Sequence, residues 1–447
     1  MPSHDDVLRN RLSAGPASHR QLIDLLGISQ PTLSRALTRL GPGLVRLGAT
    51  RSIQYALRDE MRGLPDLPIY RVNAGGQLSL LGTLVPVRAD GFVMFQEDGK
   101  ALHSAGLPWW LVDMRPQGYL GRAYATRHAG RLGLPASLGD WSDTHALRAL
   151  LVHGHDAVGN LLLGDIARDR FLSAPSPVPI DPQQKATAYA QLAREAASGE
   201  NPGSSAGGEQ PKFTAYSMTP DGARHVIVKF SETEPGPVSE RWRDLLLAEH
   251  LALQTLRDAG ISAAQSRLLD HDGQRFLEVE RFDRVGERGR RALHSLAALD
   301  AEFVGSGNGN WPSIARKLAT ERHIHADAVR TTELLWAFGT LIGNTDMHNG
   351  NLSFIADHGR PFQLAPAYDM TSMGFRPNSG GGLQDGLGEA NIHADVANAA
   401  WRQALALASD FLERVRSTTG FSARFARCVD SLSLHLAGAE EKIRRLA

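Results

Sequence analysis

The sequence contains a single cysteine, Cys428, among 447 residues. One cysteine excludes an intrachain disulfide and leaves no cysteine cluster for zinc or an iron–sulfur centre. No stretch approaches the roughly 20 uninterrupted apolar residues of a transmembrane helix. The first residues, MPSHDDVLRNRL, also lack the basic-then-apolar order of a signal peptide. The sequence therefore predicts a cytoplasmic protein that does not contact a membrane.

The chain also lacks a net charge, because 48 Lys and Arg balance 48 Asp and Glu. This balance argues against a protein that coats a polyanion with its whole surface. The length leaves room for about three domains of roughly 150 residues, and an apolar content of 42% is enough to form their cores.

Residues 18–42 contain two short helical patterns separated by Gly27. Ser29 is placed to cap the second helix, and Pro31 is tolerated in its first turn. Apolar residues recur at helical spacing and predict a buried face: Leu33, Ala36, Leu37 and Leu40. Alternation on both sides of Gly48-Ala49-Thr50 predicts a hairpin wing. The pattern indicates a winged helix-turn-helix domain over residues 1–62.

Basic charge is concentrated in this N-terminal segment. Residues 1–62 contain nine Arg and no Lys against five Asp or Glu, so they carry +4 and the remainder carries −4. A local basic charge is typical of a DNA-binding domain. The predicted DNA contacts are the outward residues of the second helix and the wing: Gln30, Thr32, Arg35, Arg39, Arg46 and Arg51. The alternative is a helical hairpin that packs on a partner or on the next domain.

Residues 63–173 are strand-like and rich in glycine, and they carry no recognisable catalytic constellation. Their tryptophans and histidines are expected in the core, in interfaces or in polar turns: Trp109, Trp110, Trp141, His153 and His155. A proline-rich break follows at residues 173–182. A helix is expected from Asp181-Pro182 to about Ala197, with Asp181 as its cap.

The segment NPGSSAGGEQPKF, residues 201–213, is a loop of small residues that leads into a strand. Glycine lets backbone amides approach a phosphate group, and serine hydroxyls can donate to it. The next strand contains Lys229, whose charge is unfavourable in a packed sheet unless an anion meets it. A helix and another strand, RFLEVERFDR, follow.

The stretch IGNTDMHNGNLSF places many polar groups between two apolar runs. Asp346 and Asn351 have the D-x-x-x-x-N spacing of a protein kinase catalytic loop, and Asp369 follows eighteen residues after Asn351. In that arrangement the first Asp accepts the proton of the attacking hydroxyl, and the other two residues bind magnesium. We expect Asp346 in a helical region and Asp369 at the end of a strand. Each residue alone is equally compatible with a helix cap or a turn, but the order of all parts favours a kinase.

Four motifs together resemble the HipA family of bacterial serine/threonine kinases, which are toxins of toxin–antitoxin systems: SSAGGEQPKF, VERFDR, IGNTDMHNGNLSF and LAPAYDMTS. The fused N-terminal module makes the chain most similar to the YjjJ-type (HipH) branch. The resemblance implies an α+β, two-lobed kinase fold after the winged helix, with a β-rich part and N-lobe over 63–295 and a helical C-lobe over 296–447.

The resemblance also implies roles for individual residues, with ATP and Mg²⁺ as cofactors. Asp346 is the catalytic base, and Asn351 and Asp369 bind magnesium. The residues expected around ATP are Ser204, Ser205, Gly207, Gly208, Lys212, Lys229, Glu280, Phe282 and His348, of which His348 is expected to orient the catalytic loop. Ser204 or Ser205 falls where the family phosphorylates itself, although GGEQPK departs from the family's Gln-Glu before the lysine.

Three classes of function are compatible with these features. The first is a kinase whose substrate, by resemblance, is an aminoacyl-tRNA synthetase or another translation factor. The second is a DNA-binding transcriptional regulator with a degenerate kinase fold, against which the complete Asp346, Asn351 and Asp369 set argues. The third is a metal-dependent DNA phosphodiesterase that uses the same carboxylates.

Overall fold

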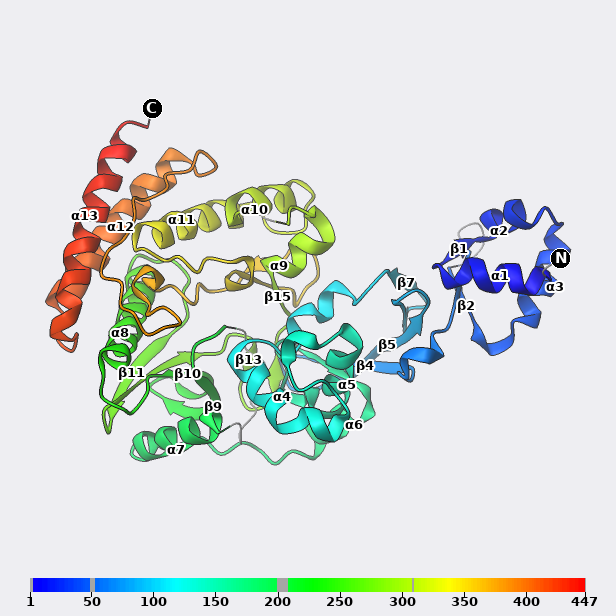
Figure 1. Cartoon of the computed structure of the whole chain (residues 1–447), viewed down its shortest axis with the longest axis horizontal. Helices are drawn as coiled ribbons and strands as arrows, with labels where there is room; N and C mark the ends of the chain where they lie inside the picture. Colours follow the sequence, from blue (N-terminus) through cyan, green and yellow to red (C-terminus); the bar gives the residue numbers. More distant parts are fainter. Residues whose placement is uncertain (1–2, 49–52, 199–207, 308, 447) are drawn as a thin grey trace.

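The computed structural model describes residues 3–48, 53–198, 208–307 and 309–446. Figure 1 shows a small N-terminal module at one end, a middle unit of sheet and helices, and a larger part that contains a second sheet and the C-terminal helices. Within the described part of the chain, no helix is both long enough and apolar enough to cross a membrane.

The N-terminal module has three helices and a three-stranded sheet in the order β1-β3-β2. Its elements are α1 His4–Ser13, β1 Ala17–Ser18, α2 His19–Leu26, α3 Gln30–Arg39, β2 Leu44–Leu47 and β3 Gln54–Leu57. Gly27 ends α2 with φ of +63°, as its position between the two helical patterns predicts. Ser29 precedes α3 but does not cap its backbone, because its hydroxyl bonds the Thr32 hydroxyl at 3.0 Å. Three helices followed by the β2–β3 hairpin are compatible with the predicted winged helix-turn-helix domain, which stays a prediction.

The middle unit is built on a five-stranded antiparallel sheet in the order β7-β6-β5-β4-β8. Its strands are β4 Leu67–Val72, β5 Leu78–Val87, β6 Gly91–Gln96, β7 Ala101–Ser104 and β8 Leu161–Leu163. Three α-helices lie between β7 and the proline-rich break. These helices were not predicted, because the sequence of this region was interpreted as strand-like. They are α4 Gly118–Leu132, α5 Asp143–His153 and α6 Gly164–Ser173.

The N-terminal module packs directly on the middle sheet. A shared apolar cluster joins the wing strands to β5 and β6: Val45, Leu47, Ala56, Val85, Val87 and Val93. Backbone hydrogen bonds run across the same junction, from Arg88 N to Leu57 O at 2.8 Å and from Asp59 N to Pro86 O at 3.0 Å. The wing and the middle sheet therefore share one core.

The next part is a four-stranded sheet in the order β11-β12-β10-β9, with a helix on each face. Its elements are α7 Lys185–Ala197, β9 Lys212–Thr219, β10 Gly222–Phe230, α8 Pro237–Asp258, β11 Ser266–His271 and β12 Gln274–Glu280. Helix α7 begins at Lys185 and not at Asp181, so the predicted start was wrong. Ile180 still pairs with Ser217, and the Asp181 carboxylate accepts from Gln183 N at 2.8 Å in a turn.

The C-terminal part is mostly helical and holds the largest apolar cluster among the described residues, which also includes most of the buried apolar residues of α8. Its elements are β13 Arg284–Val285, β14 Gly289–Arg290, β15 Leu293–Ser295, α9 Leu296–Leu299, α10 Trp311–Thr320, α11 Asp327–Leu341, β16 Ser353–Ile355, β17 Gln363–Leu364, α12 Asn398–Ser417 and α13 Ala426–Arg444. A small sheet, β15-β16-β17, carries the loop between α11 and β16.

Candidate active site

A cavity of about 330 Å³ lies where the four-stranded sheet, the C-terminal part and the middle unit meet. The wall from the sheet and α8 comprises Ile227, Lys229, Glu249, Val279, Glu280, Arg281 and Phe282. The C-terminal wall comprises Ser295, His348, Gly350, Asn351, Ser353, Tyr368 and Asp369, among others. The cavity therefore gathers most of the predicted nucleotide and metal residues that the structure describes.

Lys229 lies on β10 with its side chain buried beside two carboxylates. Its Nζ donates to Glu249 Oε1 at 2.7 Å and Oε2 at 2.9 Å, and also to Asp369. Burial alone lowers the pKa of Lys229, but Asp369 and Glu249 outweigh it and hold this pKa above its ordinary value. The anion that this buried lysine requires is thus supplied by the protein itself, and a strand lysine paired with a helix glutamate is the arrangement of protein kinases.

Asp369 is held in an uncommon backbone conformation, with φ of +51°. A non-glycine residue at positive φ persists only where its surroundings enforce it, and such residues cluster at functional sites. Burial opposes the Asp369 charge, but Lys229 and Lys212 outweigh it and lower the pKa of Asp369. No strand delivers Asp369, since β17 ends at Leu364 and only Ala367 forms a bridge, with Ala263. The expected strand was therefore wrong at this point.

Asp346 lies in the loop that follows α11, within the mostly helical C-terminal part in which it was expected. Asn351 Nδ2 donates to the Asp346 carbonyl at 2.8 Å, and Asp346 N donates to Asn344 Oδ1 at 3.0 Å. Asn344 Nδ2 reaches the Asp369 carbonyl at 3.3 Å. Buried Asn344 therefore ties the Asp346 loop to the Asp369 loop.

The glycine-rich loop is described from Gly208 onward, so Ser204, Ser205 and Gly207 lie outside the described residues. Gly208 approaches Lys212 so closely that an added Cβ would lie 2.8 Å from Lys212 Nζ. Burial lowers the pKa of Lys212 to about 8, although Asp369 counteracts this effect. Tyr119 N, in the first turn of α4, donates to the Gly208 carbonyl at 3.0 Å. The middle unit thus contacts the loop predicted to bind phosphate.

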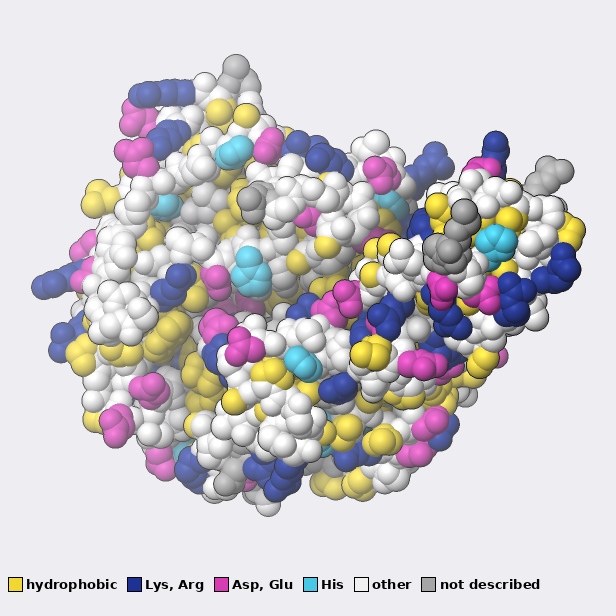
Figure 2. Space-filling model, turned by 45° about the vertical axis from the view of Figure 1, so that its right-hand side comes forward, with side chains coloured by type: hydrophobic (Ala, Val, Ile, Leu, Met, Phe, Trp, Pro, Cys, Tyr) yellow, Lys and Arg dark blue, Asp and Glu magenta, His cyan; other side chains and the backbone are white. Residues whose placement is uncertain are grey.

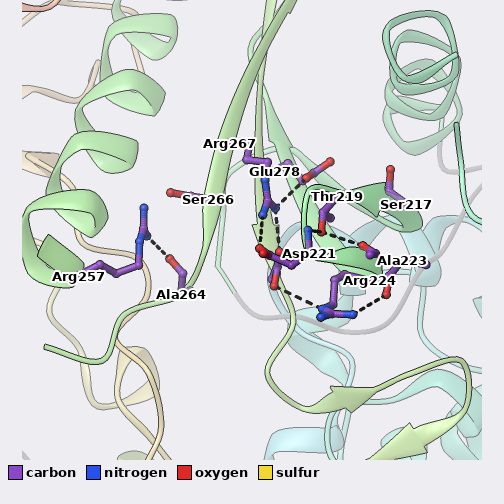
Figure 3. Close-up of polar contacts among 12 residues, drawn as sticks. Ser217, Thr219, Asp221, Ala223, Arg224, Arg257, Ala264, Ser266, Arg267 and Glu278 are labelled. Carbon is purple, nitrogen blue, oxygen red and sulfur yellow. Dashed lines mark hydrogen bonds and ion pairs between the residues drawn. The ribbon is translucent and has the colours of Figure 1, made fainter. Parts of the chain in front are cut away.

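Glu280 and Phe282 lie where β12 leaves the sheet, and both line the cavity. The Glu280 carboxylate is already paired, with Arg267 Nη1 at 2.8 Å. Figure 3 shows Arg267 between Asp221 and Glu278, at 3.1 Å and 3.4 Å. The Phe282 ring lies 5.6 Å from the Tyr368 ring.

His348 has an exposed side chain at the rim of the cavity. Its Nδ1 accepts from Gly350 N at 3.0 Å, and its carbonyl accepts from Trp311 Nε1 at 3.1 Å. These contacts fix the one-turn helix Asn349–Asn351 that carries Asn351.

The segment after Asp369 crosses the C-terminal part without helix or strand from 376 to 397. Buried Arg241, on α8, donates to the Phe375 carbonyl at 2.8 Å, the Gln384 carbonyl at 2.9 Å and Asp385 Oδ1 at 2.5 Å. Helix α8 therefore holds this segment and also positions Glu249.

The predicted DNA-contact residues lie on the N-terminal module. Gln30, Arg35 and Arg46 are exposed, and Thr32 is half-buried. Arg39 is paired with Asp5, at 3.0 Å and 2.7 Å. Figure 2, with this module turned forward, shows basic side chains on its face with acidic ones between them. Arg51 lies outside the described residues.

Glu249 and Asn344 belong to this site but were not predicted from the sequence. Glu249 is a charged residue on an otherwise apolar helix face between Leu246 and Leu253, which is a signal for a buried partner. Asn344 stands two residues before Asp346, within the same polar stretch.

Comparisons with known proteins identify related families. Residues 204–431 match the family of the HipA-like C-terminal domain, and residues 64–172 match the middle domain of YjjJ-like toxins. The chain is 40% identical to Toxin YjjJ of Escherichia coli (strain K12) over 441 residues, which cover 98% of this chain and 99% of that protein.

The fold is similar to that of a chain in the Shewanella oneidensis MR-1 complex of the toxin–antitoxin system HipA, HipB and its operator DNA. The TM-score is 0.52 at 16% identity, over 85% of this chain and 100% of that chain. The Helicobacter pylori proinflammatory kinase CtkA gives a TM-score of 0.37, which is too low to support an argument. The likeness to the HipA complex confirms the predicted two-lobed, kinase-like α+β fold. The family match over half of the chain and the full-length relative show that the chain belongs to the HipA-like toxins, in their YjjJ-like branch.

Proposed function

We propose that this chain is an ATP- and Mg²⁺-dependent serine/threonine protein kinase that acts as a toxin. The observation that carries the proposal is the buried pairing of Lys229 with Glu249 and Asp369 in one cavity. A lysine between two carboxylates is pre-positioned to contact the phosphates of a nucleotide once Asp369 turns to a metal ion.

The donor set fits a magnesium ion. Asn351 and Asp369 line the same cavity, and both offer the oxygen ligands that Mg²⁺ prefers. A bound Mg²⁺ would neutralise phosphate charge during transfer. Lys212 and Lys229 are the cations next to these ligands, and Asp346 is available to accept the proton of a substrate hydroxyl.

Phosphoryl transfer by the purified full-length chain tests the proposal. Asp346→Asn, Asn351→Ala and Asp369→Asn should each reduce transfer from labelled ATP by about a thousandfold or more, because base and metal ligands act as one unit. Thermal unfolding should remain cooperative in all three. Asp430→Asn, at an exposed site on α13, is the matched control. Transfer retained by Asp369→Asn in magnesium would contradict the assignment.

The proposed protein substrate is a translation factor such as an aminoacyl-tRNA synthetase, on the basis of the family. A phosphoproteome comparison of cells that express the wild type or Asp346→Asn tests it, and a translation factor should be phosphorylated only with the wild type.

Self-inhibition would place phosphate on Ser204 or Ser205, where a charge of about −1.5 to −2 would repel the nucleotide. Mass spectrometry should find that phosphate only in the active protein.

DNA binding through residues 1–62 is the second part of the proposal. The Shewanella complex contains HipB and operator DNA together with HipA. This chain has its own predicted winged helix-turn-helix domain, in which Gln30 and Arg35 are exposed on α3. We therefore expect the chain to bind DNA without a separate DNA-binding partner. Titration with genomic and random DNA at two salt concentrations tests this, since phosphate contacts weaken as salt rises.

The two alternative functions have less support. A regulator with a degenerate kinase fold has no need for the Lys229–Glu249 pair or for the enforced backbone of Asp369. A metal-dependent phosphodiesterase would use the same carboxylates, but the pairing of Lys229 with Glu249 beside Asp369 is the arrangement of a kinase.

A further inference from the structure

The middle unit, which carries no catalytic motif, forms one wall of the nucleotide cavity. Four of its residues line that cavity: Val112, Asp113, Gln117 and Val158. Of these four, Asp113 is the one with a charged side chain, and it lies in the six-residue 3-10 helix Trp109–Met114 after β7. Figure 1 shows this part of the chain next to β15.

The Asp113 carboxylate is held in place but only partly satisfied. It accepts from Ser295 N at 2.6 Å and from Ser295 Oγ at 2.6 Å. A carboxylate offers about four acceptor sites, so about two remain. In the described ranges of the chain, no Lys, Arg or His forms an ion pair with Asp113. A carboxylate without a cation at a cavity wall gains from any hydroxyl donor that enters.

A chain of contacts links Asp113 to both ends of the cavity. Ser295 pairs with Ser353 across β15 and β16, and Ser353 Oγ lies 2.7 Å from Tyr368 OH. Tyr368 precedes Asp369 at the metal end, and its ring packs against Phe282 at the β12 end. A nucleotide whose base lies near Phe282 and whose phosphates lie near Lys229 would have its sugar along this stretch of wall.

We propose that Asp113 accepts hydrogen bonds from the ribose hydroxyls of the bound nucleotide. The middle domain of this branch then belongs to the cofactor site and selects ribonucleotides over deoxyribonucleotides. The inference rests on the proposed ATP-dependent function. Its chemistry is that of an acidic residue that binds the ribose hydroxyls in dinucleotide sites.

Calorimetric titration of the full-length protein with Mg²⁺ and ADP, 2′-deoxy-ADP or 3′-deoxy-ADP tests the inference without turnover. The wild type should bind ADP about tenfold or more tightly than at least one deoxy analogue, as expected for a hydrogen bond to a charged group. In Asp113→Asn an NH₂ group replaces one of the two carboxylate oxygens that accept from Ser295, and the negative charge is lost. The NH₂ group cannot accept a hydrogen bond from a ribose hydroxyl. The ratio of affinities should then fall to about one to threefold.

Ser295→Ala is the matched control, because it removes the hydroxyl donor but leaves the carboxylate and the Ser295 backbone N–H. It should keep the wild-type ratio even if affinity for all three nucleotides falls. A wild type that binds ADP without discrimination, or an Asp113→Asn protein with an unchanged ratio, would overturn the inference and leave the proposed function intact. A change in the ratio of ADP to inosine diphosphate alone would assign Asp113 to the base and also overturn it. No binding of ADP by the wild type would overturn the proposed function and this inference with it.

Discussion

Lys229 and Arg35 are both expected to meet phosphate oxygens, yet their surroundings are opposite. Lys229 is 5% exposed and fixed by Glu249 and Asp369. Arg35 is exposed on α3, and its Nε makes one long hydrogen bond, 3.4 Å, to the Pro31 carbonyl. The cavity is therefore assembled before a ligand arrives, whereas the DNA-reading surface must order its side chains on binding, at an entropic cost of up to about 2 kcal/mol each. Substitutions in the cavity should therefore affect both phosphoryl transfer and stability, whereas substitutions on the DNA-binding surface should affect DNA affinity alone.

The largest effect is expected at the buried pair. Glu249→Gln should reduce phosphoryl transfer by about a hundredfold or more, because Lys229 loses the partner that orients it. The same change should lower the free energy of unfolding by about 3 kcal/mol, since it breaks a buried ion pair. Transfer assays and urea unfolding measure the two effects. Glu302→Gln, at an exposed position, is the control, and equal transfer by both variants would remove the basis of the comparison.

The next largest difference between the two regions is expected at alkaline pH, where nucleotide affinity and DNA affinity should respond differently. Lys212 has a pKa of about 8 because it is buried, so its charge disappears as pH rises through that value. Nucleotide affinity should be steady below pH 8 and fall by up to about tenfold per pH unit above it. DNA affinity should stay level over the same range, because an arginine keeps its proton to a pKa above about 12.

The contribution of Lys212 to folding stability changes with pH in the opposite direction to nucleotide affinity. The unfolded chain binds more protons than the folded chain between pH 8 and 10.5, so the contribution of Lys212 to stability rises with pH in that window. Lys212→Met should remove the pH dependence that Lys212 gives to nucleotide affinity and to folding stability, so it is the control for both measurements. Nucleotide affinity in the wild type that stays constant from pH 7 to 9 would contradict the role of Lys212.

Smaller and more selective effects are expected on the winged helix. Arg35→Ala should weaken binding to a preferred sequence by about 1–3 kcal/mol, because a helix arginine reads base edges. Arg46→Ala, on β2, should weaken all sequences alike and reduce the salt dependence. Competition titrations with preferred and random DNA distinguish these outcomes. Transfer activity should be unchanged in both variants, and its loss would contradict the separation of the two regions.

The smallest effect is expected at the Arg39–Asp5 pair. Both side chains lie at the surface, where an ion pair contributes little stability. Asp5→Ala should free Arg39 for DNA and modestly strengthen salt-sensitive binding, with little change in unfolding. Asp24→Ala, whose carboxylate lies 4.0 Å from Arg20 Nε, serves as the comparison. Weaker DNA binding by Asp5→Ala would show that Asp5 orients Arg39 instead of withholding it.

Motifs in the sequence predicted the family and the two-lobed fold, and both are confirmed. The helices of the middle unit were not predicted, because glycine suggested turns. Gly121 within α4 has a packing reason instead, since a Cβ there would lie 2.7 Å from the Pro116 carbonyl carbon. A local pattern cannot show such a close approach.

The roles of individual site residues remain predictions. The structure adds contacts of these residues that could not be predicted from the sequence. Glu249 lies twenty residues after Lys229, on a helix whose register with β10 depends on the packing of the whole lobe. Asp113 meets Ser295 across 182 residues of chain. Pairings of that kind arise from tertiary packing, which spacing within a motif does not encode.

The apolar strip shared by the wing and the middle sheet limits how this protein can be divided. Cutting the chain after residue 62 would uncover Val85, Val87 and Val93 and remove the backbone partners of Pro86 and Arg88. An exposed apolar strip beside unpaired backbone groups promotes aggregation. A fragment without the N-terminal module should therefore need polar replacements at these valines to remain dispersed, so this module is a structural component and not a removable tag.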